Sequence, residues 1–485
     1  MINIKEHFKL TAVYTFFTTF PALLQLLVYP VIEGENRLGA EEFGYLAIIE
    51  VLISLVFTVC LLGTANGLAR LYYDHKDDKQ AYNKLVSTVL SGILGRGILL
   101  IGMAFILSPV LGKVFPLPAL QNFGEYGPYA FISGLNRAVI FIAVVLFRHE
   151  KKLRPFIWVS LLSGIFRSVF QIIGVLWYDM SFRGYVYGTA IGGSIVALGI
   201  IYYLYKNCGL YYSKDLNNSL YPLARPLFFS ELIFWGLLFS DRFFLLGNPE
   251  ELGIYDNAMK FAIGIQLVLQ GLSSSIQPEI FRLLKTGIDT QQENIKKYSS
   301  LFMAESLLVI GLTIIPVMIF IEIFYETQLR LSVGIIAIIF IRFIFRTQYL
   351  IFSWPVMFTK KTIYFFIMNF LVLIVNLVLN WLFTPKIGFY GAIIAFIGAS
   401  LIQVLAFLMV QQKVMPINWN YRKMLVFPFG IIGFAILLEI IKLSINLNVY
   451  ISSLILVLSI ISGLLVLYKN ELYTLVKRPG NTNQK

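Results

Sequence analysis

The sequence predicts an all-α integral membrane protein with about 14 transmembrane helices. Of its 485 residues, 58% are hydrophobic and only 13% are charged, and its mean hydropathy is +0.78, whereas soluble domains carry about 25% charged residues. The apolar residues fall in runs of about 20, the length of helix that crosses a hydrocarbon core of about 30 Å. Because backbone groups at that depth find no water to bond, each run is expected to be a helix.

Fourteen such runs follow one another along the chain. They lie near residues 10–32, 43–69, 86–111, 125–147, 155–178, 184–205, 223–247, 254–278, 300–323, 331–358, 362–384, 388–412, 424–443 and 448–468. The first run is too long for a cleaved signal sequence, and no small-residue cleavage site follows it. Cys60 and Cys208 predict no disulfide framework. Because His7, His75 and His149 lie far apart in connecting segments, no metal site is expected.

Lysine and arginine residues collect in alternate connections between the runs. With the N-terminus inside, the inside segments hold 26 of the 39 Lys and Arg residues and the outside connections hold five. This bias follows the positive-inside rule and predicts that both termini are cytoplasmic, which requires an even number of spans. The membrane therefore explains the net charge of +13, and no nucleic-acid partner is expected.

Two short phrases recur six predicted helices apart. AEEFG (40–44) precedes PEELG (249–253) by 209 positions, and Tyr187-Gly188 precedes Tyr390-Gly391 by 203. Six is an even number, so the two copies share one orientation, as in transporters whose parallel repeats are related by an axis along the membrane normal. The sequence thus predicts two six-helix lobes at 1–205 and 223–412, a cytoplasmic linker at 206–222, two extra helices within 413–468 and a cytoplasmic tail at 469–485.

Eight basic residues fall inside the predicted spans, where a cation that faces lipid costs about 2.5–3.5 kcal/mol. Five arginines lie ten or more residues, about 15 Å, from an end of their span: Arg96, Arg137, Arg167, Arg342 and Arg346. These five either line a polar cavity or pair with buried acids and carbonyls. Nearer the ends, Lys260 fits either reading, Arg242 is expected to pair with Asp241, and Lys442 is expected to extend its ammonium group to the interface.

Acidic residues inside the spans are fewer, so the deep set keeps an excess of positive charge. Four acids are candidates for ion coupling or charge pairing: Glu50, Glu231, Asp241 and Glu305. Polar stripes add candidates for a cavity lining that could meet sugar hydroxyls, although each stripe alone is more typical of hydrogen bonding between helices: Gln25, Gln270, Asn369, Asn376 and Asn380. A cationic lining calls for an anionic substrate, and its candidate contacts are Arg96, Arg137, Arg167, Lys260, Arg342 and Arg346.

No pattern in the sequence indicates an enzyme. A membrane polymerase of sugar chains would need a long outside loop with catalytic residues, whereas every outside connection has about fifteen residues or fewer. The sequence contains no phosphate-binding glycine loop, no Ser/His/Asp set and no HExxH motif. No cofactor is expected, and coupling of transport to Na⁺ or H⁺ stays open.

Three stretches carry a family resemblance: SDRFFLLGNPEELGIYDNAMKFA (240–262), GLSSSIQPEIFRLL (271–284) and NLVLNWLFTPKIGFYGAIIAFIGASLI (376–402). With these phrases the chain resembles the Wzx-type polysaccharide flippases of the multidrug/oligosaccharidyl-lipid/polysaccharide (MOP) exporter superfamily. That family shows an Asp-Arg end to its seventh helix, a Gly-hydrophobic-Tyr opening to its eighth, and an Asn-rich eleventh helix that leads into Tyr-Gly. The likeness covers the whole chain in topology and is strong over residues 225–400.

The resemblance implies a MATE-like fold, in which two lobes work by alternating access. It implies a polyprenyl-pyrophosphate-linked oligosaccharide as substrate, moved from the cytoplasmic to the outer leaflet of a bacterial plasma membrane, with a polysaccharide polymerase as candidate partner. The deep arginines would then compensate the pyrophosphate, because guanidinium groups bind phosphate oxygens bidentately. Alternatives within the superfamily are a flippase for a lipid-linked peptidoglycan precursor and a multidrug or cation exporter, and the latter would show twelve spans and more interior acids.

Overall fold

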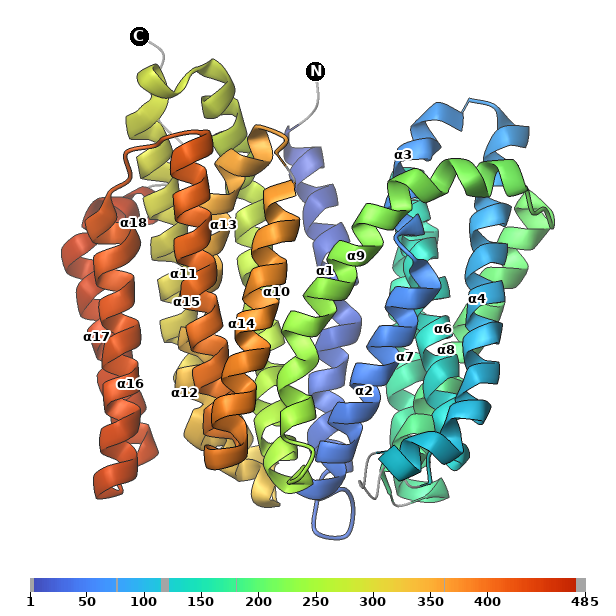
Figure 1. The fold of residues 1–485 in the computed structure, drawn as a ribbon, viewed down its shortest axis with the longest axis horizontal. Coiled ribbons are helices and arrows are strands. Elements are labelled where there is room, and N and C mark those ends of the chain that lie inside the picture. Colours follow the sequence, from blue (N-terminus) through green and yellow to red (C-terminus); the bar gives the residue numbers. More distant parts are fainter. Residues whose placement is uncertain (1–3, 76, 115–121, 180, 362, 477–485) are drawn as a thin grey trace. The chain divides into compact units, whose positions relative to one another are not determined.

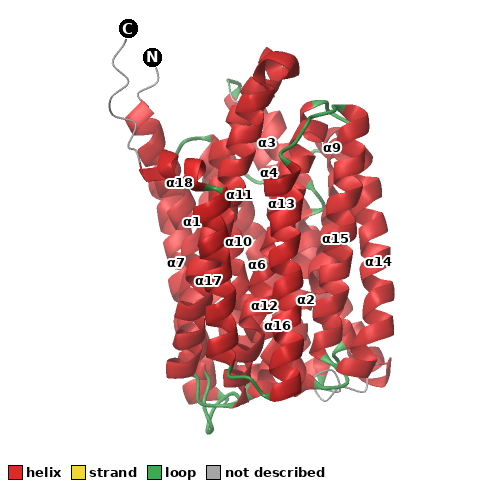
Figure 2. Ribbon diagram, turned by 90° about the vertical axis from the view of Figure 1, so that its left-hand side faces the viewer, coloured by secondary structure: helices red, strands yellow, loops and turns green. Residues whose placement is uncertain are grey.

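The computed structural model describes residues 4–75, 77–114, 122–179, 181–361 and 363–476, and the regular elements in these ranges are all helices (Figure 2). The contacts between helices divide the chain into two units, Met1–Gly253 and Ile254–Lys485. The predicted all-α fold class is confirmed.

Twelve helices in the described part of the chain are long and apolar enough to cross a membrane, or thirteen if one bent helix counts as a single span. Each of the fourteen predicted runs is mainly helical over the residues that the structure describes, although two of them contain a break, and the run 254–278 does not pass this test. It belongs to α10 (Pro249–Thr286), whose 38 residues are long enough to cross. Its polar residues, among them Gln266, Gln270 and Gln277, lower its hydropathy below that of the other spans.

The helices of the first unit are α1 (Ile4–Ile32), α2 (Ala40–Leu61), α3 (Thr64–His75), α4 (Lys79–Val114), α6 (Phe123–His149), α7 (Leu153–Ile173) with the π-helical turn η1 (Gly174–Tyr178), α8 (Phe182–Cys208) and α9 (Lys214–Phe244). Helix α6 contacts α2, α4, α7 and α8, while α1 packs on α7 and α9 packs on α2 and α3 (Figure 1). Because of these contacts α9 groups with the first unit. The two predicted six-helix lobes, 1–205 and 223–412, have other boundaries than these units, and they remain a prediction based on the repeated phrases.

The second predicted run, 43–69, is interrupted rather than continuous. Helix α2 ends at Leu61, and Leu62 and Gly63 have φ angles of 47° and 70° before α3 begins. A Cβ atom at Gly63 would lie 2.3 Å from the carbonyl oxygen of Ala224 on α9. The break therefore needs glycine both for its left-handed backbone and for the close approach of α9. Helix α9 itself bends by 57° between Pro222 and Ala224.

The helices of the second unit that follow α10 are α11 (Ile288–Phe324), the 3₁₀ turn η2 (Gln328–Ser332), α12 (Val333–Ile341), α13 (Phe343–Phe358), α14 (Ile363–Ile387), α15 (Phe389–Val414), the π-helical turn η3 (Arg422–Val426), α16 (Phe427–Ile445), α17 (Val449–Leu467) and α18 (Lys469–Val476). Helix α15 packs on α13 and α14, and α11 contacts α12, α13 and α17. The predicted run 331–358 is divided at Arg342, whose carbonyl accepts a hydrogen bond at 3.0 Å from the backbone N–H of Phe345, three residues on.

The repeated Tyr-Gly phrase occupies the same place in each unit. In the first unit, a Cβ atom at Gly188 of α8 would lie 2.0 Å from the carbonyl oxygen of Phe170 on α7. In the second unit, a Cβ atom at Gly391 of α15 would lie 2.5 Å from Cα of Thr384 on α14. Each phrase thus lets two consecutive helices approach closely, as expected of two copies of one ancestral unit.

Candidate functional site

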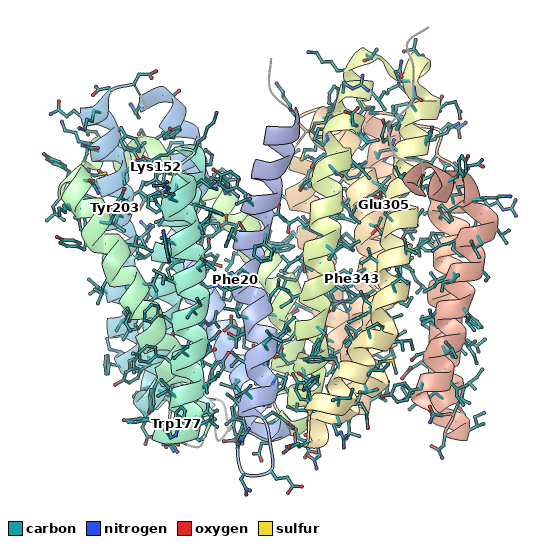
Figure 3. All side chains as sticks on the ribbon, turned by 180° about the vertical axis from the view of Figure 1, so that it is seen from behind. Phe20, Lys152, Trp177, Tyr203, Glu305 and Phe343 are labelled. Carbon is teal, nitrogen blue, oxygen red and sulfur yellow. The ribbon has the colours of Figure 1, made fainter. Side chains whose placement is uncertain are left out.

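A carboxylate and two guanidinium groups meet at mid-depth in the first unit. Arg137 of α6 donates a hydrogen bond of 2.7 Å from Nη1 to Oε1 of Glu50 on α2, and Arg167 Nη2 on α7 lies 3.5 Å from Oε2 of the same carboxylate. All three residues lie about ten or more positions, or about 15 Å, from both ends of their spans. Lys152, the residue before α7, and Trp177, within η1, lie at opposite ends of this unit (Figure 3).

Aromatic side chains complete this Glu50–Arg137–Arg167 cluster. The Arg137 guanidinium lies over the ring of Phe57, 5.3 Å from its centroid, and a side-chain hydrogen bond joins Arg167 to Tyr185 of α8. Two positive charges and one negative charge leave the cluster with one positive charge in excess. The cluster can therefore attract an anion at a depth where an uncompensated charge is costly.

The remaining deep arginine of the first unit, Arg96 on α4, lies outside the cluster. Its Nε donates to the carbonyl oxygen of Cys60 at 2.9 Å, at the last turn of α2. Its Nη2 is buried and finds no hydrogen-bond acceptor among the described residues. Arg96 thus binds the end of α2 through Nε, and its Nη2 group remains available to donate a hydrogen bond.

Two acidic candidates of the first unit bind partners outside the cluster. Glu231 of α9 accepts a hydrogen bond of 3.3 Å from Asn66 of α3. Asp241 lies 3.1 Å from the guanidinium of Arg242, and both side chains are buried, which confirms the predicted local pair. Gln25 of α1 is partly buried, and its Nε2 finds no acceptor among the described residues.

In the second unit, the two predicted arginines lie against aromatic rings. The Arg342 guanidinium is 4.2 Å from the centroid of Phe396 on α15, and that of Arg346 is 5.1 Å from the centroid of Tyr349. Tyr349 shares a side-chain hydrogen bond with Asn369 of α14. These contacts bring α13, α14 and α15 together around the two arginines.

In the predicted polar stripe on α14, Asn369 forms a hydrogen bond to another helix, whereas Asn376 and Asn380 bond within α14. Asn369 accepts a hydrogen bond of 2.8 Å from Gln403 of α15. Asn376 and Asn380 are buried: Asn380 donates to Asn376 Oδ1 at 3.1 Å, and Thr384 donates to Asn380 Oδ1 at 3.0 Å. This burial places the two asparagines in helix packing here, and their part in a cavity lining stays a prediction.

The other candidates of the second unit lie on α10 and α11. Lys260 pairs with Asp256 one turn away, at 3.1 Å, and both side chains are largely buried. Gln270 is exposed on the same helix. Glu305 lies midway along α11 (Figure 3), and one oxygen of its carboxylate is buried without a hydrogen-bond donor in the described chain.

Lys442 does not extend to the interface as predicted. It is 9% exposed, forms an ion pair with Glu439, and donates a hydrogen bond of 2.5 Å to the carbonyl oxygen of Gly334 on α12. Glu439 also accepts a hydrogen bond of 3.1 Å from Tyr390 of α15. This network binds α16 to its neighbours, because a buried pair with further hydrogen bonds avoids the cost of an isolated charge.

Sequence reasoning missed the aromatic partners of the arginines, Phe57, Tyr185, Tyr349 and Phe396. Aromatic residues make up 15% of this chain, so their presence near an arginine on another helix gives no signal in the sequence. Phe396 lies within the family-like stretch 376–402, and Tyr185 lies two residues before the repeated Tyr187-Gly188, but neither place predicts a contact with an arginine.

Comparison with known proteins agrees with this architecture. Residues 37–334, more than half of the chain, match the family described as "Polysaccharide biosynthesis protein". The chain is also 20% identical over 286 residues to "Lsg locus putative protein 1" of Haemophilus influenzae, a match that covers 57% of this chain and 67% of that protein.

Solved structures show the same fold. The lipid II flippase MurJ in an inward closed conformation matches with a TM-score of 0.70 and 16% identity, over 96% of this chain and 100% of MurJ. An inward-facing multidrug resistance MATE transporter of the MOP superfamily matches with a TM-score of 0.64 and 12% identity, over 83% of this chain and 97% of that chain. The chain is a multi-pass membrane protein with the fold of these transporters, and it belongs to the polysaccharide biosynthesis protein family, as its resemblance to the polysaccharide flippases predicted.

Proposed function

We propose that this protein is an alternating-access flippase that moves a polyprenyl-pyrophosphate-linked oligosaccharide from the cytoplasmic to the outer leaflet for export of a surface polysaccharide. The family match supports a role in polysaccharide biosynthesis, and the fold is that of transporters. In this proposal the protein is not an enzyme, binds no nucleic acid or cofactor, and lies in a bacterial plasma membrane with both termini in the cytoplasm.

The observation that carries the proposal is the excess positive charge of the Glu50–Arg137–Arg167 cluster. Three helices hold its side chains at mid-depth, where an uncompensated charge is costly. Guanidinium groups bind phosphate oxygens through two parallel hydrogen bonds, so they suit a pyrophosphate better than a neutral sugar or a cation. A pyrophosphate bound here would cross the membrane with its charge compensated.

The rest of the substrate needs different surroundings. Asn369, Gln403 and Gln270 offer amide groups that can hydrogen-bond to sugar hydroxyls, while the polyprenyl chain stays in the bilayer. Glu231 and Glu305 are our candidates for coupling to Na⁺ or H⁺, because neither is seen paired with a cation in the described part of the chain. A polysaccharide polymerase is the partner that would use the flipped product.

The test is the sidedness of the lipid-linked oligosaccharide in a strain that lacks the gene. A membrane-impermeant reagent that modifies sugars should label less of the intermediate than in the wild type, and the wild-type gene should restore labelling. Restoration should fail with the Arg137→Gln variant, although that variant reaches the membrane. Normal sidedness in the deletion strain, together with altered drug sensitivity, would move the protein to the drug exporters.

A second candidate function is a flippase for a lipid-linked peptidoglycan precursor. The observation that favours it is the likeness to the lipid II flippase MurJ over 96% of the chain. The two candidates separate in a strain depleted of its own lipid II flippase. Growth restored by this gene would support the second candidate, whereas loss of surface polysaccharide without a growth defect in the deletion strain would support the first.

A further inference from the structure

A single carboxylate holds both arginines of the cluster. Each oxygen of Glu50 faces a different guanidinium, Oε1 that of Arg137 and Oε2 that of Arg167. The three side chains come from α2, α6 and α7, so the carboxylate occupies a point where three helices converge. An anion that binds both arginines at once must occupy the same point.

The cluster has more donors than Glu50 can satisfy. The 3.5 Å separation from Arg167 exceeds the 2.7–3.2 Å range of good N–H···O hydrogen bonds, and Arg167 Nε is buried without an acceptor among the described residues. Gln25 Nε2 on α1 is also buried and also lacks an acceptor among the described residues. A group with more acceptor oxygens than a carboxylate could satisfy such donors.

Gln25 on α1 and Arg167 on α7 each lie about one helical turn beyond the point where these two helices touch. Helices α1 and α7 pack together and run in the same direction (Figure 1), and a Cβ atom at Gly164 of α7 would lie 3.2 Å from Cα of Pro21 on α1. Gln25 follows Pro21 by four residues and Arg167 follows Gly164 by three, which is about one turn on each helix. The unsatisfied donors of the two helices therefore lie at the same level.

The Glu50 contacts are also open to a ligand. The side chains of Glu50, Arg137 and Arg167 are 34%, 44% and 29% exposed. In comparison, the side chains of the Lys260–Asp256 pair are 12% and 5% exposed. A buried ion pair such as Lys260–Asp256 is structural, whereas an accessible ion pair such as Arg137–Glu50 can exchange its carboxylate for another anion.

We propose that Glu50 is a displaceable counter-ion: a phosphate group of the substrate takes its place between Arg137 and Arg167 and also accepts from Arg167 Nε and Gln25. This inference rests on the proposed function for the identity of the phosphate carrier. Because Glu50 and the phosphate compete for the same two arginines, Glu50 weakens binding and, by returning to the arginines, promotes release. The displacement breaks no covalent bond.

The experiment measures binding of a polyprenyl pyrophosphate to the purified full-length protein in lipid nanodiscs. Glu50→Gln, which keeps the shape of the side chain and removes the competing charge, should tighten binding by about tenfold, as expected from the loss of one charge-assisted contact. Arg137→Gln and Arg167→Gln should each weaken it by about tenfold or more. In cells, Glu50→Gln should slow export despite its tighter binding, since release becomes limiting.

Glu279→Gln is the matched control. It also removes one negative charge beside an arginine, because Glu279 pairs with Arg282 at 2.9 Å, but it lies on α10 and outside the cluster. Its binding should equal that of the wild type. If Glu50→Gln does not fold, Glu50→Asp keeps the charge but shortens its reach by one methylene, and it should tighten binding to a smaller extent. Binding by either variant that is weaker than or equal to that of the wild type overturns the displacement.

The two proposals fail differently. If the arginine variants weaken binding but Glu50→Gln does not tighten it, the phosphate site stands and only the displacement by Glu50 is refuted. If neither arginine variant changes binding, the cluster is not a phosphate site and both proposals fail. If inorganic pyrophosphate competes as well as the lipid-linked form, displacement is supported, but the site then recognises free phosphate anions and the lipid-linked substrate is contradicted.

Discussion

Gly44 and Gly253, 209 positions apart, each pack against the first residue of the phrase that contains the other. A Cβ atom at Gly44 would lie 1.9 Å from the carbonyl oxygen of Pro249, and a Cβ atom at Gly253 would lie 1.9 Å from that of Ala40. The two Glu-Glu-X-Gly phrases therefore contact each other in a reciprocal way. The sequence shows the recurrence of the phrase, but it does not show that the two phrases are in contact.

The first prediction concerns this reciprocal contact. Gly44→Ala places a methyl group where the backbone of Pro249 lies, so the start of α2 and the start of α10 must separate. Overpacking of this kind lowers the free energy of unfolding by about 1–3 kcal/mol. Thermal unfolding of the purified protein measures the loss. Gly95→Ala on α4, where no atom lies within 4 Å of the new methyl group, should not destabilise the protein, and equal melting temperatures for both variants would refute the contact.

The second prediction concerns Arg342, which lies over the ring of Phe396. Arg342→Ala should abolish polysaccharide export while the protein still reaches the membrane. Phe396→Leu, which keeps bulk but removes the aromatic ring, should lower export less, since a cation–π contact contributes about 0.5–2 kcal/mol. The readout is surface polysaccharide together with protein in the membrane fraction. Arg330→Ala, an exposed arginine paired with Glu322, is the control. Wild-type export from Arg342→Ala contradicts a substrate role.

The third prediction concerns the Lys442–Glu439 pair. Lys442→Met removes the cation and leaves a largely buried carboxylate, which should destabilise the protein by about 3–5 kcal/mol. Adding Glu439→Gln to the same chain should recover most of this loss, because no unpaired charge remains. Thermal unfolding of the single and double variants gives the comparison. A double variant no more stable than Lys442→Met would show that the ammonium bond to Gly334, rather than the ion pair, stabilises α16.

The fourth prediction concerns the hydrogen bonds along α14. Asn380→Leu removes the acceptor of Thr384 and the donor to Asn376, and it leaves these buried groups without that partner. The expected loss is about 1–3 kcal/mol, again measured by thermal unfolding. Thr384→Val should cost less, because it removes one hydrogen bond and retains shape. An unchanged melting temperature for Asn380→Leu would instead favour a place for Asn380 in the polar cavity lining.

Much of the fold was predictable because the membrane imposes a simple rule on the sequence. An apolar run of about 20 residues must be a helix when it crosses the bilayer, and the described residues of all fourteen runs are mainly helical. What the runs did not show were the interruptions at Gly63 and Arg342. Those depend on the approach of α9 and on local 3₁₀ hydrogen bonding, and neither is encoded in hydropathy.

The candidate site was predictable only as a set of residue types. An arginine at mid-depth is costly unless it faces a partner or a polar space. Depth alone therefore singled out five arginines: Arg96, Arg137, Arg167, Arg342 and Arg346. Depth does not say which arginine meets which acid. Glu50 was one of several candidate acids, and its pairing with two arginines 87 and 117 positions away depends on how α2, α6 and α7 pack.

The sequence by itself determined that this chain is a membrane protein with an excess of deep positive charge, because hydropathy and charge count are properties of residues in order. It also predicted a twofold internal repeat. Tertiary structure alone decided that Arg137 and Arg167 share one carboxylate while Arg342 lies on an aromatic ring. Helices of similar composition can pack in many rotations about their own axes. Only the packing itself selects the rotation that turns each side chain toward its partner.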